Sequence, residues 1–398
     1  MKVCVLGAGA SGLMAAITAR RNNEDVTIIN NANKPGKKIL MTGNGKCNIT
    51  NLLMNETFYD DDCKAFVKYV LAEFSEKDTL KFFEGIGVHT YDKDGYVYPL
   101  SNQASTVLNH MLIEVERLGV KIINECIVKD IRKNTIICED REINFDKLII
   151  ATGGVTAKKS GSDGSSYDLI KKLGHTVSNP VPVLTGVACS NKRLKDISGV
   201  RSKVVANLLY DGKLIDSESG ECQFTDKGLS GICIFNLSIK IKKLIEKAEY
   251  KNIVIDLELC PEINKEDLEY LLRTSKNLGM PVADVINGYI NFKLATYICK
   301  NANVNPYKDS SELTDKDIKV LSDKIKHFTF KVSELINSDN AQATSGGVSL
   351  LEIDSKTMKS KINDNVYFAG EVLDVVGKCG GYNLQFAFSS GFIAGCLK

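Results

Sequence analysis

Short apolar runs alternate with helix-like spacing from the start of the chain. Residues 3–6 are continuously apolar and predict a buried strand, residues 13–20 have the spacing of an alanine-rich helix, and residues 26–29 predict a second strand. This order predicts a β-α-β unit. The alternation continues with helices expected at 64–72, 76–85, 107–118 and 167–173. Strands are expected at 88–99 (a hairpin), 120–124, 135–138 and 147–150, and a further strand is expected to begin at 126–128.

The pattern changes near residue 184 and changes back near residue 340. Short strands separated by turns predict a small antiparallel barrel. The residues that follow have helical spacing, and the helix caps are expected at Asn264, Asp284 and Thr314. The last 60 residues return to a strand followed by a long helix. The barrel strands are expected at 183–189, 201–210, 212–217, 221–231, 253–259 and 328–332, the helical part at 261–327, the late strand at 366–368 and the final helix at 383–396.

Composition narrows the class of protein. The 398 residues are 43% hydrophobic and 25% charged, which is typical of a globular chain. The net charge of +2 does not indicate the strongly positive surface that binds nucleic acid or an anionic membrane. We therefore expect neither as a partner. The 12 cysteines contain no C-x-x-C and the four histidines are far apart, so no metal site is expected and a reducing cytoplasm fits best.

The apolar residues 3–19 do not read as a signal peptide. Three glycines interrupt the run and Arg20 and Arg21 follow it, and no stretch of 18 or more apolar residues occurs elsewhere to predict a membrane span. A different function explains these glycines. Gly7, Gly9 and Gly12 form G-x-G-x-x-G between the first strand and the first helix, the context in which this motif binds the pyrophosphate of a dinucleotide.

The end of the second strand departs from the usual dinucleotide-binding pattern. An acidic residue that binds the ribose hydroxyls is expected there, but the chain has Asn30 followed by Asn31. An amide can bond to a diol without charge assistance.

A polar, glycine-rich stretch follows where a nicotinamide dehydrogenase would continue with a helix. Its sequence, PGKKILMTGNGKCNITN (residues 35–51), resembles the signature PG-R/K-K-x-L-x-S/T-G-x-G-R/K-C-N-x-T-N of the BaiN-like flavoproteins, also known as the aminoacetone-oxidase family of FAD-binding enzymes in the glutathione-reductase-like superfamily. Four more segments carry the resemblance in the same order. ATGG at 151–154 resembles the superfamily, and GExxFTxxGxSG at 220–231, AxxTxGGV at 341–348 and YFxGExxDxxGxxGGYNLQ at 367–385 resemble the family.

The resemblance implies an α/β fold: a Rossmann-like FAD/NAD(P)-binding domain with an inserted antiparallel β-barrel and a small helical subdomain. We expect the domain boundaries to follow the pattern changes described above. The FAD-binding domain is then residues 1–183 and 341–398, the inserted barrel 184–260 with its return strand 328–340, and the helical insert 261–327.

The loops and the resemblance together predict where FAD is bound. Loop glycines let backbone approach the cofactor, and the amides at the start of the final helix can face the pyrimidine edge of the flavin, whose reduced form carries negative charge there. Ile127 and Val128 are expected beside the adenine from the resemblance alone. The full predicted set is Gly7, Gly9, Ala10, Ser11, Gly12, Asn30, Asn31, Lys38, Thr42, Gly43, Asn44, Gly45, Cys47, Asn48, Ile127, Val128, Ala151, Thr152, Gly153, Gly370, Glu371, Gly380, Gly381, Tyr382, Asn383 and Gln385.

Two features have more than one interpretation. The segment Gly161-Ser162-Asp163-Gly164 is either a separate NAD(P) loop or a loop in which Asp163 or Ser162 caps the next helix; the missing third glycine favours the loop. Cys47 is either a thiol against the flavin or a small packing residue, and Tyr382 is either a proton donor or a wall of the flavin pocket. No cysteine partners Cys47 nearby, which argues against disulfide exchange.

The predicted function is that of an FAD-dependent oxidoreductase acting on a small molecule. The resemblance implies NAD(P)H as a reductant in some members, and either reduction of a conjugated double bond in a steroid-like acid thioester or oxidation of an amine with O₂. The alternatives are a flavin-binding redox sensor and an FAD-using RNA-modification protein. Neither the substrate nor the oligomeric state follows from the sequence.

Overall fold

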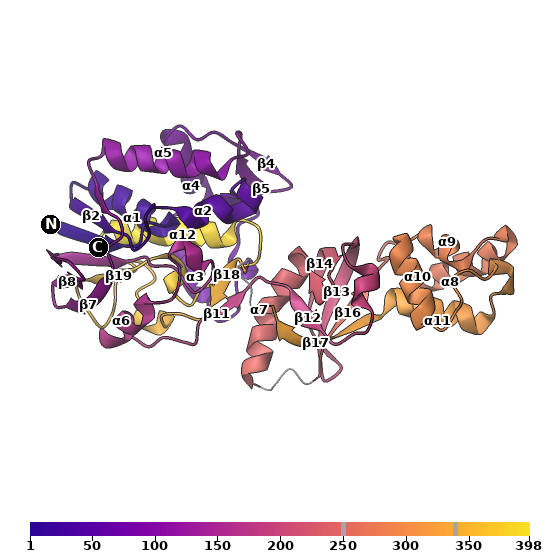
Figure 1. The fold of residues 1–398 in the computed structure, drawn as a ribbon. Helices are drawn as coiled ribbons and strands as arrows, with labels where there is room; N and C mark the ends of the chain where they lie inside the picture. Colours follow the sequence, from indigo (N-terminus) through magenta and orange to yellow (C-terminus); the bar gives the residue numbers. More distant parts are fainter. Residues whose placement is uncertain (248–251, 337–340) are drawn as a thin grey trace. The chain divides into compact units, whose positions relative to one another are not determined.

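The chain forms two compact units, each with its own hydrophobic core. The computed structural model describes residues 1–247, 252–336 and 341–398. One unit comprises Met1–Pro182 and Asp339–Lys398, and the other comprises Val183–Ser338 (Figure 1). Residues 337–340, the end of the expected return strand, lie outside the described residues.

A five-stranded parallel sheet forms the centre of the first unit. Its order is β19-β10-β1-β2-β6, so the two strands nearest the N-terminus lie between strands from much later in the chain. All its strands point the same way, and therefore their carboxyl ends share one edge. The strands are β1 (Lys2–Leu6), β2 (Asp25–Ile29), β6 (Lys121–Ile123), β10 (Lys147–Ile150) and β19 (Val366–Phe368).

Two helices from opposite ends of the chain pack closely beside this sheet (Figure 1). They are α1 (Ala10–Arg21) and α12 (Tyr382–Gly395). At Gly391 an added Cβ would come within 2.5 Å of the Ser11 carbonyl oxygen, so the two backbones touch without side chains between them. This packing brings the start of the last helix to the phosphate-loop end of the sheet.

Smaller elements surround the parallel sheet. Two three-stranded antiparallel sheets have the orders β3-β5-β4 and β7-β8-β9. The remaining elements of this unit are α2 (Lys37–Met41), β3 (Thr50–Asn51), α3 (Lys64–Glu73), α4 (Glu76–Gly85), β4 (Thr90–Lys93), β5 (Tyr96–Pro99), α5 (Ala104–Arg117), β7 (Val128–Arg132), β8 (Thr135–Cys138), β9 (Glu142–Asn144), α6 (Ser166–Lys172), β11 (Val181–Val183) and β18 (Ala343–Ser345).

The second unit is a closed six-stranded barrel with added helices. The strand order is β12-β15-β14-β13-β16-β17, and every pairing is antiparallel. Together with the parallel sheet of the first unit, this confirms the predicted fold class. The elements are β12 (Val187–Cys189), β13 (Arg201–Tyr210), β14 (Lys213–Phe224), β15 (Gly228–Ser230), α7 (Ile232–Lys247), β16 (Ile253–Glu258), α8 (Lys265–Thr274), α9 (Val282–Asn287), α10 (Phe292–Asn301), α11 (Asp315–Lys326) and β17 (Phe328–Leu335).

Several local predictions differ from the structure. The strands expected at 212–217 and 221–231 are instead the continuous strand β14 (Lys213–Phe224) and the short strand β15. The strand expected at 183–189 is interrupted, because Leu184 has a left-handed φ of 53° that no strand continues through. Asp284 does not cap a helix: α9 begins at Val282 after Pro281, so Asp284 lies in its first turn. The 16-residue helix α7 was not predicted at all.

Candidate functional site

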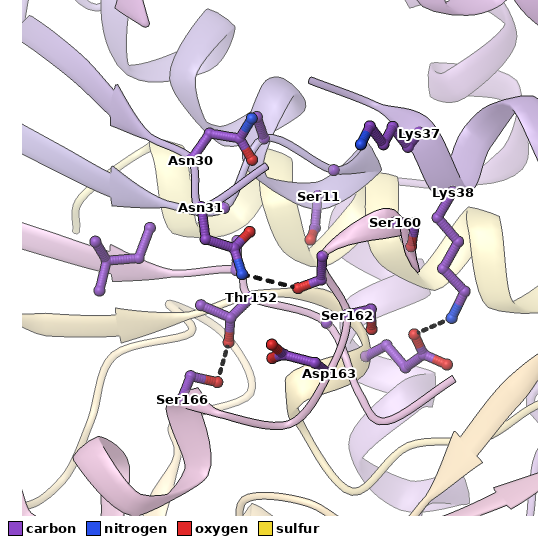
Figure 2. Close-up of a pocket in the computed structure, with 18 of the residues that line it drawn as sticks. Ser11, Asn30, Asn31, Lys37, Lys38, Thr152, Ser160, Ser162, Asp163 and Ser166 are labelled. Carbon is purple, nitrogen blue, oxygen red and sulfur yellow. Dashed lines mark hydrogen bonds and ion pairs between the residues drawn. The ribbon is translucent and has the colours of Figure 1, made fainter. Parts of the chain in front are cut away.

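A cavity of about 600 Å³ lies in the first unit, at the carboxyl end of the parallel strands (Figure 2). Open parallel sheets bind ligands at this edge. Several segments that are distant in the sequence meet there. The lining residues are Leu6–Ser11, Ile29–Asn31, Gly36–Ile39 with Thr42, Cys126–Lys129, Ala151–Gly153, Ser160–Asp163 with Ser165, Ser166 and Leu169, Gln342 with Glu371, and Asn383, Leu384 and Ala387.

The glycine loop forms one wall of the cavity, and its three glycines have different neighbours. Gly7 has a φ of 103°, and a Cβ there would lie 2.3 Å from the Ala151 carbonyl oxygen. A Cβ on Gly12 would lie 1.9 Å from the Gly7 carbonyl oxygen. A Cβ on Gly9 would meet no protein atom within 4 Å, so Gly9 opens onto the cavity. Two glycines therefore permit the loop's packing and the third keeps the cavity clear.

The N-terminus of α1 faces this space with its amides available. Gly9 is the N-cap residue, no side chain caps the helix, and no acidic residue lies in its first turn. Uncapped N–H groups and the positive end of the helix dipole favour an anion. The cavity, the open space at Gly9 and this helix end fit the diphosphate of a dinucleotide.

Asn30 and Asn31 lie at the end of β2, where an acidic residue was expected. Asn30 is buried, and its amide nitrogen donates to the Ala32 carbonyl oxygen (2.9 Å) and to Asn124 Oδ1 (2.8 Å). The Asn31 amide nitrogen donates to the Gly161 carbonyl oxygen (3.2 Å). The Asn30 side chain is thus held by the protein itself.

A charged pair occupies another part of the wall. Lys38 Nζ lies 2.5 Å from Glu371 Oε2 and 2.6 Å from Thr156 Oγ1. The other carboxylate oxygen of Glu371 accepts from the Thr344 amide (2.8 Å). The acid is therefore neutralised before any ligand enters the cavity.

The predicted cofactor residues divide between the cavity wall and its surroundings. Gly43, Asn44 and Gly45 have left-handed φ angles and form an exposed turn beside the lining residue Thr42. Fifteen of the predicted residues line the cavity, and the other eleven do not. The lining ones are Gly7, Gly9, Ala10, Ser11, Asn30, Asn31, Lys38, Thr42, Ile127, Val128, Ala151, Thr152, Gly153 and Glu371, together with Asn383, and the rest are Gly12, Gly43, Asn44, Gly45, Cys47, Asn48, Gly370, Gly380, Gly381, Tyr382 and Gln385.

Cys47 and Tyr382, the two residues considered for a catalytic role, are both buried. Cys47 has no exposed surface, and burial raises the pKa of its thiol to about 11. The Tyr382 ring stacks on Phe58 with the ring centroids 4.6 Å apart, and burial raises the pKa of its hydroxyl to about 12. At neutral pH both groups are protonated and neither lines the cavity.

The sequence did not assign the serine-rich segment 160–166 to the site. It forms a wall of the same cavity instead of a second nucleotide loop. Neither Ser162 nor Asp163 caps α6, whose N-cap residue is Ser165. Ser162 Oγ donates to the Gly154 carbonyl oxygen, because the segment folds back onto the ATGG strand end (Figure 2). The glycines and serines of 160–166, which begin shortly after ATGG, were the signal available in the sequence.

Two further properties bear on the class of protein. Within the described residues, no group of three or more His, Cys, Asp or Glu side chains is arranged to hold a metal ion. None of the described helices has both the length and the apolar surface needed to cross a bilayer.

The chain is similar to known proteins over its full length. The family model described as "HI0933-like protein Rossmann domain" matches residues 1–397. A 3-dehydro-bile acid delta(4,6)-reductase of Clostridium scindens is 34% identical, covering 99% of this chain and 98% of its own. A ribosomal RNA dihydrouridine synthase of Haemophilus influenzae is 28% identical, covering 98% and 96%. Among solved structures, a 3-ketosteroid-delta4-(5alpha)-dehydrogenase of Rhodococcus jostii has a TM-score of 0.47 at 14% identity, covering 99% of this chain and 95% of that one.

Proposed function

This chain belongs to the HI0933-like family of Rossmann-domain proteins, and from that membership we propose that it reduces a carbon–carbon double bond conjugated with a carbonyl group in a small, steroid-like molecule. The chain is an FAD-dependent oxidoreductase. The identity of the double bond, the substrate and the electron donor are the parts that we add as proposals.

The similarity to the bile acid reductase carries the proposal. Identity of 34% extends over 99% of this chain, so it includes both units and not only the dinucleotide-binding part. Dihydrouridine, the product named for the other relatives, differs from uridine by two hydrogens across a double bond conjugated with a carbonyl. Addition of hydrogen across such a bond is therefore common to both kinds of relative.

The residues of the cavity fit FAD. The amides at Ala10 and Ser11 would hold the diphosphate, Ile127 and Val128 would flank the adenine, and the segment at Glu371 and Asn383 would hold the flavin end. Bound there, FAD would supply a two-electron redox centre, which the side chains lining the cavity do not provide. The protein's own part is to bind, to orient and to keep water from the reacting groups.

We propose NAD(P)H as the electron donor, acting transiently. Lys37, Lys38 and Lys129 line the cavity wall, but Lys38 is paired with Glu371 and Lys129 with Glu139. Among the described residues, Lys37 is the lining lysine without an ion pair, and its charge can attract an anionic dinucleotide. A second candidate function, reduction of uridine in RNA, is favoured by the whole-length similarity to the dihydrouridine synthases. The net charge of +2 provides little general attraction for the phosphates of RNA, which favours the small-molecule substrate.

Anaerobic photometry tests the proposal. We expect purified protein to be yellow, NADH or NADPH to bleach it, and a 3-oxo-4-ene steroid to restore the colour with loss of the steroid's conjugated absorbance. Restoration by unmodified ribosomal RNA, with the steroid inert, would favour the second candidate. Bleaching by amines alone would make the protein an oxidase, and a flavin that no reductant bleaches would make it a sensor.

A further inference from the structure

The cavity lacks an acid at the position where one is expected. In dinucleotide-binding folds a carboxylate at the end of the second strand accepts hydrogen bonds from the ribose hydroxyls. Here that position is Asn30, and its amide nitrogen is already bonded to Ala32 and Asn124. The charge that normally recognises the diol is missing from β2.

A segment from elsewhere in the chain reaches this end of the cavity. Residues 157–166, which we call the strap, cross from the ATGG strand end to the end of β2. Asn31 donates to the Gly161 carbonyl oxygen (3.2 Å), and Thr152 Oγ1 lies 2.7 Å from Ser166 Oγ. The contact at Gly161 is close: a Cβ there would lie 2.7 Å from Asn31 Oδ1, and its φ is 95°.

The strap carries a carboxylate into the cavity wall. Asp163 lines the cavity, and its side chain points from the strap toward the part where Thr152 lies (Figure 2). Because consecutive Cα atoms are 3.8 Å apart, Asp163 Cα lies within about 8 Å of Gly161 Cα. The carbonyl oxygen of Gly161 accepts the hydrogen bond from Asn31. An acid absent from β2 in sequence is thus present near it in space.

One oxygen of this carboxylate is available to a ligand. Asp163 Oδ1 accepts from the Ser165 amide (3.0 Å) and from Ser165 Oγ (2.7 Å), which sets the turn before α6. In the part of the chain that the structure describes, Oδ2 has no hydrogen-bond partner and no lysine or arginine forms an ion pair with Asp163. The other acid of the wall, Glu371, is paired with Lys38.

We propose that Asp163 binds the ribose diol of the cofactor's adenosine half and so replaces the acid missing at Asn30. An uncompensated carboxylate repels a phosphate but accepts strong hydrogen bonds from neutral hydroxyls. The ribose is the part of FAD's adenosine half that offers two adjacent hydroxyls. Asp163 is therefore a cofactor-binding residue supplied by the strap.

This inference rests on the proposed binding of FAD, and the test separates the two. The probes are ADP and 2′,3′-dideoxy-ADP, titrated calorimetrically into the full-length chain after its flavin has been removed. The variant is Asp163→Asn, which keeps the Oδ1 acceptor of the turn. The matched control is Asp168→Asn on α6, whose carboxylate is 86% exposed and outside the cavity lining.

We expect wild-type protein to bind ADP about tenfold more tightly than dideoxy-ADP, as hydrogen bonds to a charged acceptor predict. The preference should fall to about twofold in Asp163→Asn and stay near tenfold in Asp168→Asn. FAD should dissociate about tenfold more readily from Asp163→Asn, measured by flavin fluorescence.

Three results would overturn the inference while the proposed function stands. They are equal binding of both probes by wild-type protein that still binds FAD, an unchanged preference in Asp163→Asn, and tighter FAD binding by Asp163→Asn, which would place the acid beside the diphosphate. Failure of wild-type protein to bind FAD or ADP would instead remove the proposed function.

Discussion

The ammonium group of Lys38 lies 2.5 Å from Glu371 Oε2 and joins two segments 333 positions apart in the sequence. The lysine precedes the exposed turn at Thr42, and the glutamate follows the last strand of the parallel sheet. The pair is partly buried, with 27% and 22% of the side chains exposed. It links the two halves of the dinucleotide-binding unit within the cavity wall.

Breaking this pair should weaken cofactor binding. Lys38→Met leaves the Glu371 carboxylate uncompensated where an anionic cofactor enters. We expect the FAD dissociation constant to rise about tenfold, less than for a fully buried pair, because solvent screens partly exposed charges. Flavin fluorescence titration measures it. The double variant Lys38→Met/Glu371→Gln should recover part of the loss.

Lys37→Met serves as the control for that experiment. Lys37 lies on the same helix and lines the same cavity, yet forms no ion pair among the described residues. We expect the FAD dissociation constant of Lys37→Met to rise only about two- to threefold, because solvent and salt screen the charge of an unpaired lysine. A loss equal to that of Lys38→Met would show that total charge, and not the pair, determines affinity.

The glycine loop gives two contrasting substitutions. Gly9→Val should fold normally and be colourless, because the side chain enters the cavity without touching the protein. Gly12→Val should lower stability by more than about 3 kcal/mol, because it collides with the Gly7 carbonyl oxygen. Thermal unfolding and the flavin absorbance of the purified proteins distinguish them. Full retention of FAD by Gly9→Val would contradict the placement of the diphosphate.

The chain should lose stability in mild acid because of a buried histidine. Burial lowers the pKa of His175 despite its bond to Glu352 (3.0 Å), so the folded state binds this proton less readily than the unfolded state. Stability must therefore fall as the pH drops below the unfolded value of 6.5. Burial opposes ionisation of Glu352, but hydrogen bonds from Thr176 and His175 outweigh it and lower the pKa, so a further loss follows below 4.5.

Urea unfolding at pH 7.5 and pH 5.5 measures the first of these losses. His175→Gln should be less stable than wild type at pH 7.5 by about 1–3 kcal/mol, because Ser360 and Glu352 lose a partner, yet should change less between the two pH values. His89→Gln, on an exposed side chain, should keep the wild-type pH dependence. An equally steep dependence in His175→Gln would assign the acid sensitivity to other groups.

Cys47 should prove dispensable for redox chemistry. Its thiol is fully buried with a pKa raised to about 11, so almost none is ionised at neutral pH. Cys47→Ala should bleach with reductant at the wild-type rate, with a stability loss of about 1 kcal/mol from the smaller side chain. Stopped-flow photometry gives the rate, and a loss of bleaching in folded, yellow protein would restore the thiol as a participant.

Local patterns predicted much of the architecture correctly. The β-α-β opening, the barrel and the final helix all follow from apolar periodicity, because burial of one face imposes a repeat that the sequence carries. Helix α7 was not predicted. The segment expected as a strand, 221–231, ends at Gly231, and α7 begins at the very next residue, so no loop separates the two patterns. Asp284 was mistaken for a cap since an acid is equally favourable inside the first turn.

The sequence by itself determined that a strand, a glycine turn and a helix would present bare amides to a dinucleotide, because all three are neighbours along the chain. Only the tertiary structure decided that Lys38 meets Glu371, and that the strap brings Asp163 to the end of β2. Those pairs depend on how distant segments pack, and a contact across a hundred or more residues leaves no repeat in the sequence from which to infer it.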